Sequence, residues 1–183
     1  MYLYKRTYIG NHHRKPEEQL KIKFGKPKKP TLWGENKTNG IKQERISQIV
    51  EQVGYWRKAN AIHKWFIENC AEGEDDCREF YVDNEQLQEL LDIVKKVIKG
   101  SKLVKAKIQV GTRWSGKGEE AIMEDGKIIK DSSLAEELLP TTSGFFFGGT
   151  AYDQYYFQDL KDTKKILETA VKEGGDYYYR ASW

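Results

Sequence analysis

The strongest structural constraint in the sequence is an amphipathic helix that we expect over residues 84–100. Asp83 is placed as its N-cap and Gln86 follows three residues later, which is the spacing of a capping box. Gly100 is placed to end the helix. The apolar residues between these limits fall on one stripe that another layer of the fold must cover; they are Leu87, Leu90, Leu91, Val94, Val97 and Ile98.

Two more helices are expected in the C-terminal half of the chain. Ser133 and Glu136 have the spacing of a capping box and open a short helix. Thr150 is the expected N-cap of the last helix, with Asp153 in its first turn, and the glycines at 174–175 close it. Apolar and aromatic residues recur along this last helix at helical spacing: Tyr152, Tyr155, Tyr156, Leu160, Ile166, Leu167 and Val171.

Strands are expected at both ends of the chain and between the helices. Residues 1–9 and 20–24 are rich in β-forming residues or alternate in polarity, and residues 176–183 are expected to pair with the N-terminal strand. Residues 103–110 alternate as a half-buried strand does. Because Asp125-Gly126 is a turn signal, residues 103–130 predict a β-hairpin, with residues 111–120 as an extra loop inside it.

These elements predict an α+β fold in a single domain over residues 1–183. It would have about three main helices, a small antiparallel sheet and the β-hairpin. Residues 1–40 would form an N-terminal region of strands followed by a loop over residues 25–40, where Gly, Pro and Asn are frequent. The elements do not alternate as βαβ units, so we expect no Rossmann-type sheet.

Charge and composition narrow the classes of function. The chain carries 31 Lys+Arg against 28 Asp+Glu, and a net charge of +3 is too small to indicate duplex DNA binding. No run approaches the length of a membrane span, and residues 1–10 lack the apolar core of a signal peptide. Cys70 and Cys77 are then expected to be reduced thiols of a cytosolic protein, with a disulfide between them as the alternative.

We expect neither a metal nor a cofactor. Six residues separate Cys70 from Cys77, which fits no common zinc pattern. His12 and His13 are adjacent, and adjacent side chains on a strand point to opposite faces. Cys70 lies two helical turns after His63, too far for a nucleophile–base pair.

Residues 54–66, GYWRKANAIHKWF, are the first candidate for a binding site. Residues 41–69 are predicted to form one helix, since Ile46, Ile49, Val50 and Val53 recur on one face. If the helix continues past Gly54, Arg57, Asn60 and Lys64 lie on this same face. Either the helix kinks at Gly54, or these polar side chains face a cavity. A buried cation needs a partner, which is either a carboxylate of the protein or an anionic ligand.

Residues 141–150, TTSGFFFGGT, are the second candidate. Gly144, Gly148 and Gly149 permit close approach of the backbone. Thr141, Thr142 and Ser143 offer hydroxyl groups. The segment leads into the expected helix N-terminus at Thr150, where free N–H groups favour an anion. The phenylalanines at 145–147 either stack on a ligand ring or fill the core.

Two blocks resemble a widespread family of small proteins of tailed phages and prophages. They are VGYWRKANAIHKWFIEN with DDCREFYV, and ELLPTTSGFFFGGTAYDQYYFQDLKDTKKILE, and together they cover roughly residues 53–98 and 136–168. Family members are mostly of unknown function, so the resemblance implies a setting and no chemistry. Simpler members lack much of residues 1–40 and have little between the second helix and LLPTTSGFFFG. The resemblance therefore implies that the hairpin region, residues 101–133, is an insertion.

The leading hypothesis is a phage-encoded binding protein without enzymatic activity. The resemblance places it in the cytoplasm of an infected bacterium, where it would sequester a nucleotide-derived immune signal of the host, as a homo-oligomer. Cations would meet phosphate, rings would stack on a base, and amide and hydroxyl groups would read polar edges. The expected ligand-binding residues are Tyr55, Trp56, Arg57, Asn60, His63, Lys64, Arg78, Thr142, Ser143, Gly144, Phe146 and Thr150.

Two alternatives remain open. In the first, the protein inhibits or docks on a host or phage protein and binds no small molecule. Its aromatic surface and the hairpin residues Arg113, Trp114 and Lys117 would then form the interface. In the second, it is an enzyme acting on nucleotides with His63 as general acid or base.

Overall fold

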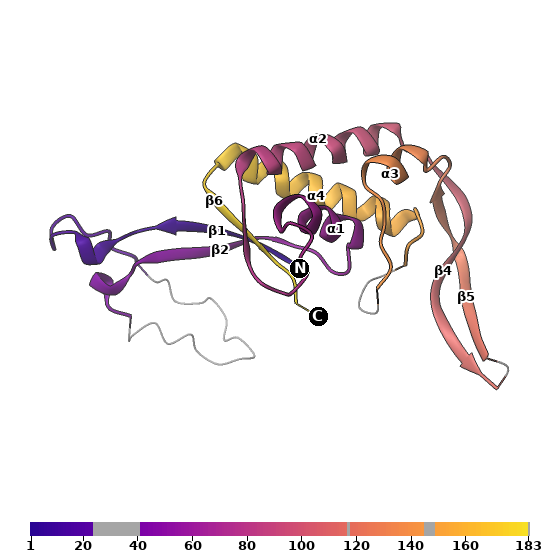
Figure 1. The fold of residues 1–183 in the computed structure, drawn as a ribbon, viewed down its shortest axis with the longest axis horizontal. Coiled ribbons are helices and arrows are strands. Elements are labelled where there is room, and N and C mark those ends of the chain that lie inside the picture. The colour runs from indigo at the N-terminus through magenta and orange to yellow at the C-terminus, as the bar shows by residue number, and fades with distance from the viewer. Residues whose placement is uncertain (24–40, 117, 145–148, 183) are drawn as a thin grey trace. The chain divides into compact units, whose positions relative to one another are not determined.

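The structure, a computed structural model, describes residues 1–23, 41–116, 118–144 and 149–182 and confirms the α+β fold (Figure 1). A four-stranded antiparallel sheet has the order β2-β1-β6-β3, and β4 and β5 form a separate antiparallel hairpin. The strands are β1 (Tyr2–Tyr8), β2 (Gln48–Tyr55), β3 (Phe80–Val82), β4 (Leu103–Ser115), β5 (Gly118–Ile129) and β6 (Asp176–Arg180). The helices are α1 (Asn60–Cys70), α2 (Asn84–Gly100), α3 (Ser133–Leu138) and α4 (Gln154–Glu173), with 3-10 turns at Asn11–His13 and Gln43–Arg45.

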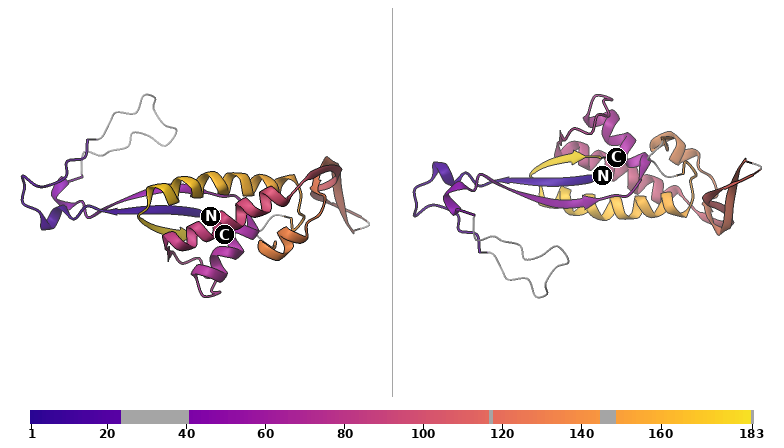
Figure 2. Two further views of the ribbon diagram at one scale, coloured as in Figure 1. Left: turned by 90° about the horizontal axis from the view of Figure 1, so that it is seen from above. Right: turned by 90° about the horizontal axis from the view of Figure 1, so that it is seen from below.

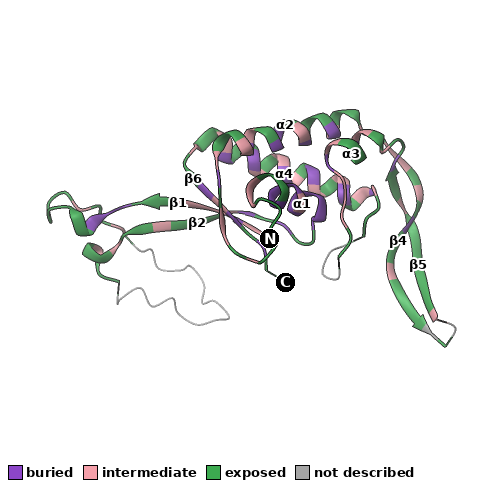
Figure 3. Cartoon of the chain, viewed as in Figure 1, coloured by how far each residue is buried: buried purple, intermediate pink, exposed green. Residues whose placement is uncertain are grey.

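Helix α2 forms as its sequence predicts. The Asp83 carboxylate accepts a hydrogen bond from the Gln86 N–H at 2.7 Å, and the Gln86 side chain accepts one from the Asp83 N–H at 3.0 Å. Its apolar stripe is buried toward the core, as the purple segments in Figure 3 show. Seen from above in Figure 2, α2 and α4 run side by side, and Lys95 pairs with Glu168 between them at 3.2 Å.

The predicted single helix over residues 41–69 is wrong in its first half. Residues 48–55 are strand β2, and α1 begins only at Asn60. The β-branched residues Ile49, Val50 and Val53 favour a strand, which overrides their helical spacing. Gly54 lies where a Cβ atom would come within 2.9 Å of the Ile166 side chain and 3.1 Å of Leu3, so the backbone itself packs there. The face traced across Gly54 therefore does not exist.

The two predicted caps in the C-terminal half are displaced. The N-cap of α3 is Ser132, without a side-chain cap, and Ser133 bonds Asp131 instead. The N-cap of α4 is Asp153 and not Thr150. Asp153 pairs with the Ile128 position of β5, and the Ile129 N–H donates to the Tyr152 carbonyl at 2.8 Å. The chain before Gln154 is thus held extended, and the helix starts after it.

The hairpin is confirmed, but its turn is not where the sequence predicted. Asp125 and Gly126 lie inside β5, opposite Lys107 and Ala106, and most of residues 111–120 belong to the strands. A Cβ atom on Gly126 would lie 2.5 Å from Cδ1 of the buried Ile108. The glycine therefore makes room for a cross-strand side chain. Much of the hairpin is exposed (green in Figure 3), including Trp114, which is 78% exposed.

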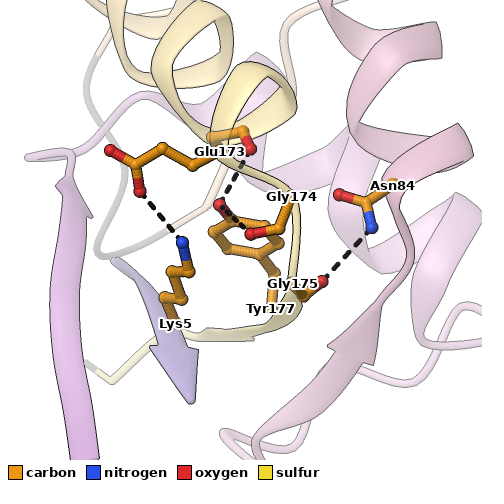
Figure 4. A network of polar contacts seen from close by, with 7 residues as sticks. Lys5, Asn84, Glu173, Gly174, Gly175 and Tyr177 are labelled. Atoms are coloured by element: carbon orange, nitrogen blue, oxygen red, sulfur yellow. Dashed lines mark hydrogen bonds and ion pairs between the residues drawn. The ribbon is translucent and has the colours of Figure 1, made fainter. Parts of the chain in front are cut away.

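The strand at the C-terminus lies beside β1, as predicted. Lys5 on β1 pairs with Glu173 at the end of α4 at 3.0 Å. The Tyr177 hydroxyl on β6 donates to the carbonyls of Ala170 and Gly174, which fixes the turn between α4 and β6 (Figure 4). Large rings fill the core beneath; Phe66 stacks on Tyr179 at a centroid distance of 4.2 Å.

The chain divides into two compact units, residues 1–5 with 52–183 and residues 6–51. In the smaller unit the buried Asn11 amide donates to the carbonyls of Leu20 and Gln43, and its oxygen accepts the Leu20 N–H. The strand predicted over residues 20–24 does not form over residues 20–23, and residue 24 and the loop predicted at 25–40 lie outside the described residues. Within the described ranges, no helix is both long enough and apolar enough to cross a membrane.

Candidate functional site

A cavity of about 860 Å³ lies in the larger unit between the start of α1, the middle of β4 and the first half of α4. Small-molecule sites have volumes of about 300–1,000 Å³, so the cavity has room for a nucleotide-sized ligand. Three walls line it. The described lining is residues 57–62 on the α1 side, residues 109–112 on β4, and residues 141, 149–151, 153, 155, 156 and 158–160 on the α4 side.

The α1 wall carries the cations. Arg57 and Lys58 are exposed, and no carboxylate of the described residues forms an ion pair with either. Lys58 has a φ of 62°, in the left-handed region that side chains rarely adopt. Ala59 is the N-cap of α1 and offers no side-chain acceptor to the first N–H groups of the helix. Positive charge therefore collects at this end of the cavity.

Asn60 joins the α1 wall to the predicted loop. Its amide nitrogen donates to the Gly149 carbonyl at 3.1 Å, and its amide oxygen accepts the Thr142 N–H at 3.4 Å. The Thr141 hydroxyl closes the same segment by donating to the Thr150 carbonyl at 2.9 Å. The buried Asn60 is thus a clamp on both ends of the loop, and these bonds use half of the hydrogen-bonding capacity that we expected it to offer a ligand.

The α4 wall carries carboxylates. Asp153 is buried, and one of its oxygens accepts the N–H groups of Tyr155 and Tyr156 at 2.8 and 3.1 Å. Asp159 is half-buried, and its pKa is raised to about 7, chiefly by burial and further by the negative charges of Asp162 and Asp153. A carboxyl group that titrates near neutrality can donate or accept a proton at physiological pH.

The β4 wall contains an irregularity. The register of the hairpin shifts between Gln109 and Gly111, so Val110 is an extra, bulged residue on β4. All three residues line the cavity. Bulges bend a strand and are frequent beside functional sites. The left-handed Lys58 and this bulge are two backbone irregularities, far apart in the sequence, that meet at one cavity.

Three of the twelve predicted ligand-binding residues line this cavity: Arg57, Asn60 and Thr150. Trp56 is buried in the core, where its indole N–H donates to the Thr163 hydroxyl at 2.8 Å. Tyr55 is exposed and packs against Tyr2, with 5.4 Å between ring centroids. Thr142, Ser143 and Gly144 are outside the lining, and Phe146 lies outside the described residues.

The other two predicted cations are neutralised by the protein. Lys64 pairs with Glu68 one helical turn away at 3.7 Å. Arg78 is exposed and pairs with Glu74 and Asp76, and their charges raise the pKa of its guanidinium. Neither residue lines the cavity. Of the cations in the predicted set, Arg57 alone is presented to the cavity.

His63 belongs to a buried polar chain. Its ring is 2% exposed, its Nδ1 lies 2.8 Å from the Tyr179 hydroxyl, and its Nε2 lies 3.0 Å from the Asp75 carboxylate. Burial raises the pKa of the Tyr179 hydroxyl, and the charge of Asp75 adds to the effect. Both ring nitrogens are therefore engaged away from the cavity lining. This geometry gives no support to His63 as a general acid or base.

Lys58, Tyr155, Asp153 and Asp159 line the cavity but were missed by sequence reasoning. We assigned Tyr155 to the apolar stripe of the last helix, whereas its ring is 55% exposed. The available signal was its spacing: Tyr155 and Asp159 are four residues apart and therefore share one face of α4.

No group of three or more His, Cys, Asp or Glu residues suited to a metal occurs in the described parts of the chain. Cys70 and Cys77 are free thiols, and burial raises the pKa of Cys70 to about 12.

Comparisons with protein-family models, with curated proteins and with solved structures found no match to this chain. The cavity between α1, β4 and α4 is therefore the structural feature from which a function can be proposed.

Proposed function

We propose that this protein is a phage-encoded binding protein that holds a nucleotide-derived host signal in the cavity between α1, β4 and α4, and so blocks antiviral defence. The observation that carries the proposal is the pair Arg57 and Lys58. Both line the cavity, and both lack an ion-pair partner among the described residues. Cations that are not paired with carboxylates are available to a phosphate group.

The rest of the cavity suits the remainder of a nucleotide. Tyr155 presents an exposed ring on which a base can stack. Thr112 and Thr150 offer hydroxyl groups to a sugar or a base edge, while the Gln109 amide nitrogen already donates to the Gly111 carbonyl and to the Thr112 hydroxyl. The phosphate-binding role that we first gave to Lys64 and Arg78 passes to Lys58, because the protein's own carboxylates already neutralise those two residues.

The phage setting is what the resemblance of residues 53–98 and 136–168 implies, and the antiviral target is part of the present proposal. Two of the three cavity walls fall in these blocks, and the third, on β4, falls in the segment interpreted as an insertion.

Isothermal titration calorimetry tests the proposal. The panel contains cyclic mono- and dinucleotides, nucleoside diphosphates, ADP-ribose and the matching unphosphorylated nucleosides. We expect heat from at least one phosphorylated compound and none from its nucleoside, because the cationic end binds the phosphate. Absence of heat from the whole panel, with the protein folded by circular dichroism, would contradict the proposal.

Docking on a protein is a second candidate, favoured by the exposed hairpin. Trp114 and Met123 are half or more exposed, and tryptophan is frequent among the residues that dominate binding energy at interfaces. A single stoichiometric partner that is lost with Trp114→Ala and kept with Arg57→Ala would support this function. Capture that is insensitive to Trp114→Ala would count against it.

A further inference from the structure

The α4 wall of the cavity combines a ring and a carboxyl group in one fixed arrangement. Tyr155 and Asp159 are separated by one helical turn, so their side chains leave the same face of α4 with about 5–6 Å between their Cβ atoms. Both line the cavity. A planar ligand that stacks on the Tyr155 ring therefore brings its edge toward the Asp159 carboxyl group.

When it is ionised, Asp159 makes this end of the cavity an acceptor of hydrogen bonds. Asp153, the N-cap of α4, and Asp162 on that helix are negative, and both act on the Asp159 carboxyl group. The cations Arg57 and Lys58 line the cavity from the α1 side, and the neighbouring Tyr156 hydroxyl donates away to the Leu139 carbonyl at 3.0 Å. The cavity thus has a cationic wall and a carboxylate wall.

Among the common bases, guanine fits a carboxylate best. Its N1–H and exocyclic N2–H₂ are adjacent donors, which one carboxylate accepts with its two oxygens. Adenine and cytosine present a donor beside an acceptor on the same edge, and an ionised carboxylate repels that acceptor. Hypoxanthine keeps the N1–H and lacks the amino group, so it isolates the contribution of the second donor.

We propose that the cavity is selective for guanine nucleotides, with the base stacked on Tyr155, its N1–H and N2–H₂ edge on the Asp159 carboxylate, and the phosphate at Arg57 and Lys58. This inference rests on the proposed function, because it names the base of the nucleotide that the same cavity holds. It adds a specificity-determining residue, Asp159, outside the set predicted from the sequence.

The arrangement links binding to pH. Only the ionised carboxylate accepts both donors, and the pKa of Asp159 is about 7 in the free protein. The ionised fraction rises from about a tenth at pH 6 to about nine-tenths at pH 8, so the preference for guanine should strengthen about tenfold over this interval. Ratios between ligands isolate this effect, since the phosphate groups of the compared ligands titrate alike.

The experiment is calorimetric titration with guanosine, inosine and adenosine diphosphates at pH 6 and pH 8. At pH 8 we expect guanosine diphosphate to bind about tenfold or more tightly than the other two, and at pH 6 most of this preference is lost. Asp159→Asn should abolish both the preference and its pH dependence. Glu168→Gln, on the same helix and outside the cavity lining, should keep both.

The outcomes separate the two proposals. Three results would overturn the proposed selectivity for guanine while leaving nucleotide binding intact. They are equal binding of the three diphosphates at pH 8, tighter binding of adenosine diphosphate, and a preference that Asp159→Asn leaves unchanged. Binding of no nucleotide by the folded protein overturns the proposed function, and this inference fails with it.

Discussion

Lys58 carries backbone strain at the scale of a single residue. Its φ of 62° is costly for a residue with a Cβ atom, by about 1–2 kcal/mol, and glycine escapes this cost but loses more entropy on folding. We therefore expect Lys58→Gly to be about 0.5–1 kcal/mol more stable than Lys58→Ala in denaturant unfolding. Both variants lose the charge, so their difference isolates the backbone. Equal stabilities would show that the left-handed conformation is not strained.

The raised pKa of Asp159 predicts that the stability of the protein depends on pH. Its pKa is about 7 in the folded protein against 3.8 for an ordinary Asp, so the folded state holds a proton that the unfolded state releases between these values. This contribution to stability is complete below about pH 4 and is lost as pH rises to about 7. Discounted for the partial exposure of the side chain, the loss is about 2 kcal/mol.

The Asp159→Asn variant makes this loss measurable. Its free energy of unfolding relative to the wild type should rise between pH 4 and pH 7 and stay level above, because the variant does not titrate there. Urea unfolding across this range gives the difference directly. A difference that is constant with pH would mean that Asp159 has an ordinary pKa, and the pH dependence of guanine selectivity would then also be absent.

At the scale of elements, helix α4 depends on its displaced N-cap. The Asp153 carboxylate accepts two of the first N–H groups of the helix, so Asp153→Ala should cost about 0.5–2 kcal/mol of stability. Asp153→Asn keeps a capping oxygen and should cost much less. Thermal unfolding of both variants checks this. If the alanine and asparagine variants are equally stable, the charge of Asp153 matters and its capping does not.

The hairpin depends on Gly126. A Cβ atom there would lie 2.5 Å from Cδ1 and 2.7 Å from Cγ1 of Ile108, so Gly126→Ala should destabilise the protein by about 1–3 kcal/mol. In an Ile108→Ala background the same change should cost much less, because the side chain in the way is gone. A double-mutant cycle measures this coupling. Independent effects of the two substitutions would contradict the packing role assigned to Gly126.

Elements were predictable where several local signals agreed. For α2, the capping box, the apolar stripe and Gly100 all indicate one helix, and it forms. In residues 41–55 the spacing of the apolar residues indicated a helix, whereas the β-branched side chains favoured a strand. Residues 48–55 form a strand, which pairs with β1. Thr150 and Asp153 were both suitable caps. Only the contact of Asp153 with β5 selects between them, and that contact is not visible in the local sequence.

At the scale of the whole molecule, the site was predictable only in part. Partners one helical turn apart are visible in the sequence, as for Lys64 with Glu68 and Arg78 with Glu74. The cavity instead joins residues 57–62, 109–112 and 141–160. Which polar side chains meet there depends on packing over a hundred residues of chain. Asp159 was therefore missed, and the sequence could not show that Arg57 has no ion-pair partner among the described residues.

The proposed function requires that the cavity bind phosphate through Arg57 and Lys58. Calorimetry with the best phosphorylated ligand of the panel tests this on three proteins: the wild type, the double variant Arg57→Ala with Lys58→Ala, and Lys64→Ala. The Lys64→Ala variant is the control, because it removes a cation that is already paired with Glu68. We predict that the double variant binds about tenfold or more weakly, since charge-assisted hydrogen bonds contribute about 1.5–3 kcal/mol each, while the control binds as the wild type does. Equal affinity of the double variant and the wild type would contradict the account.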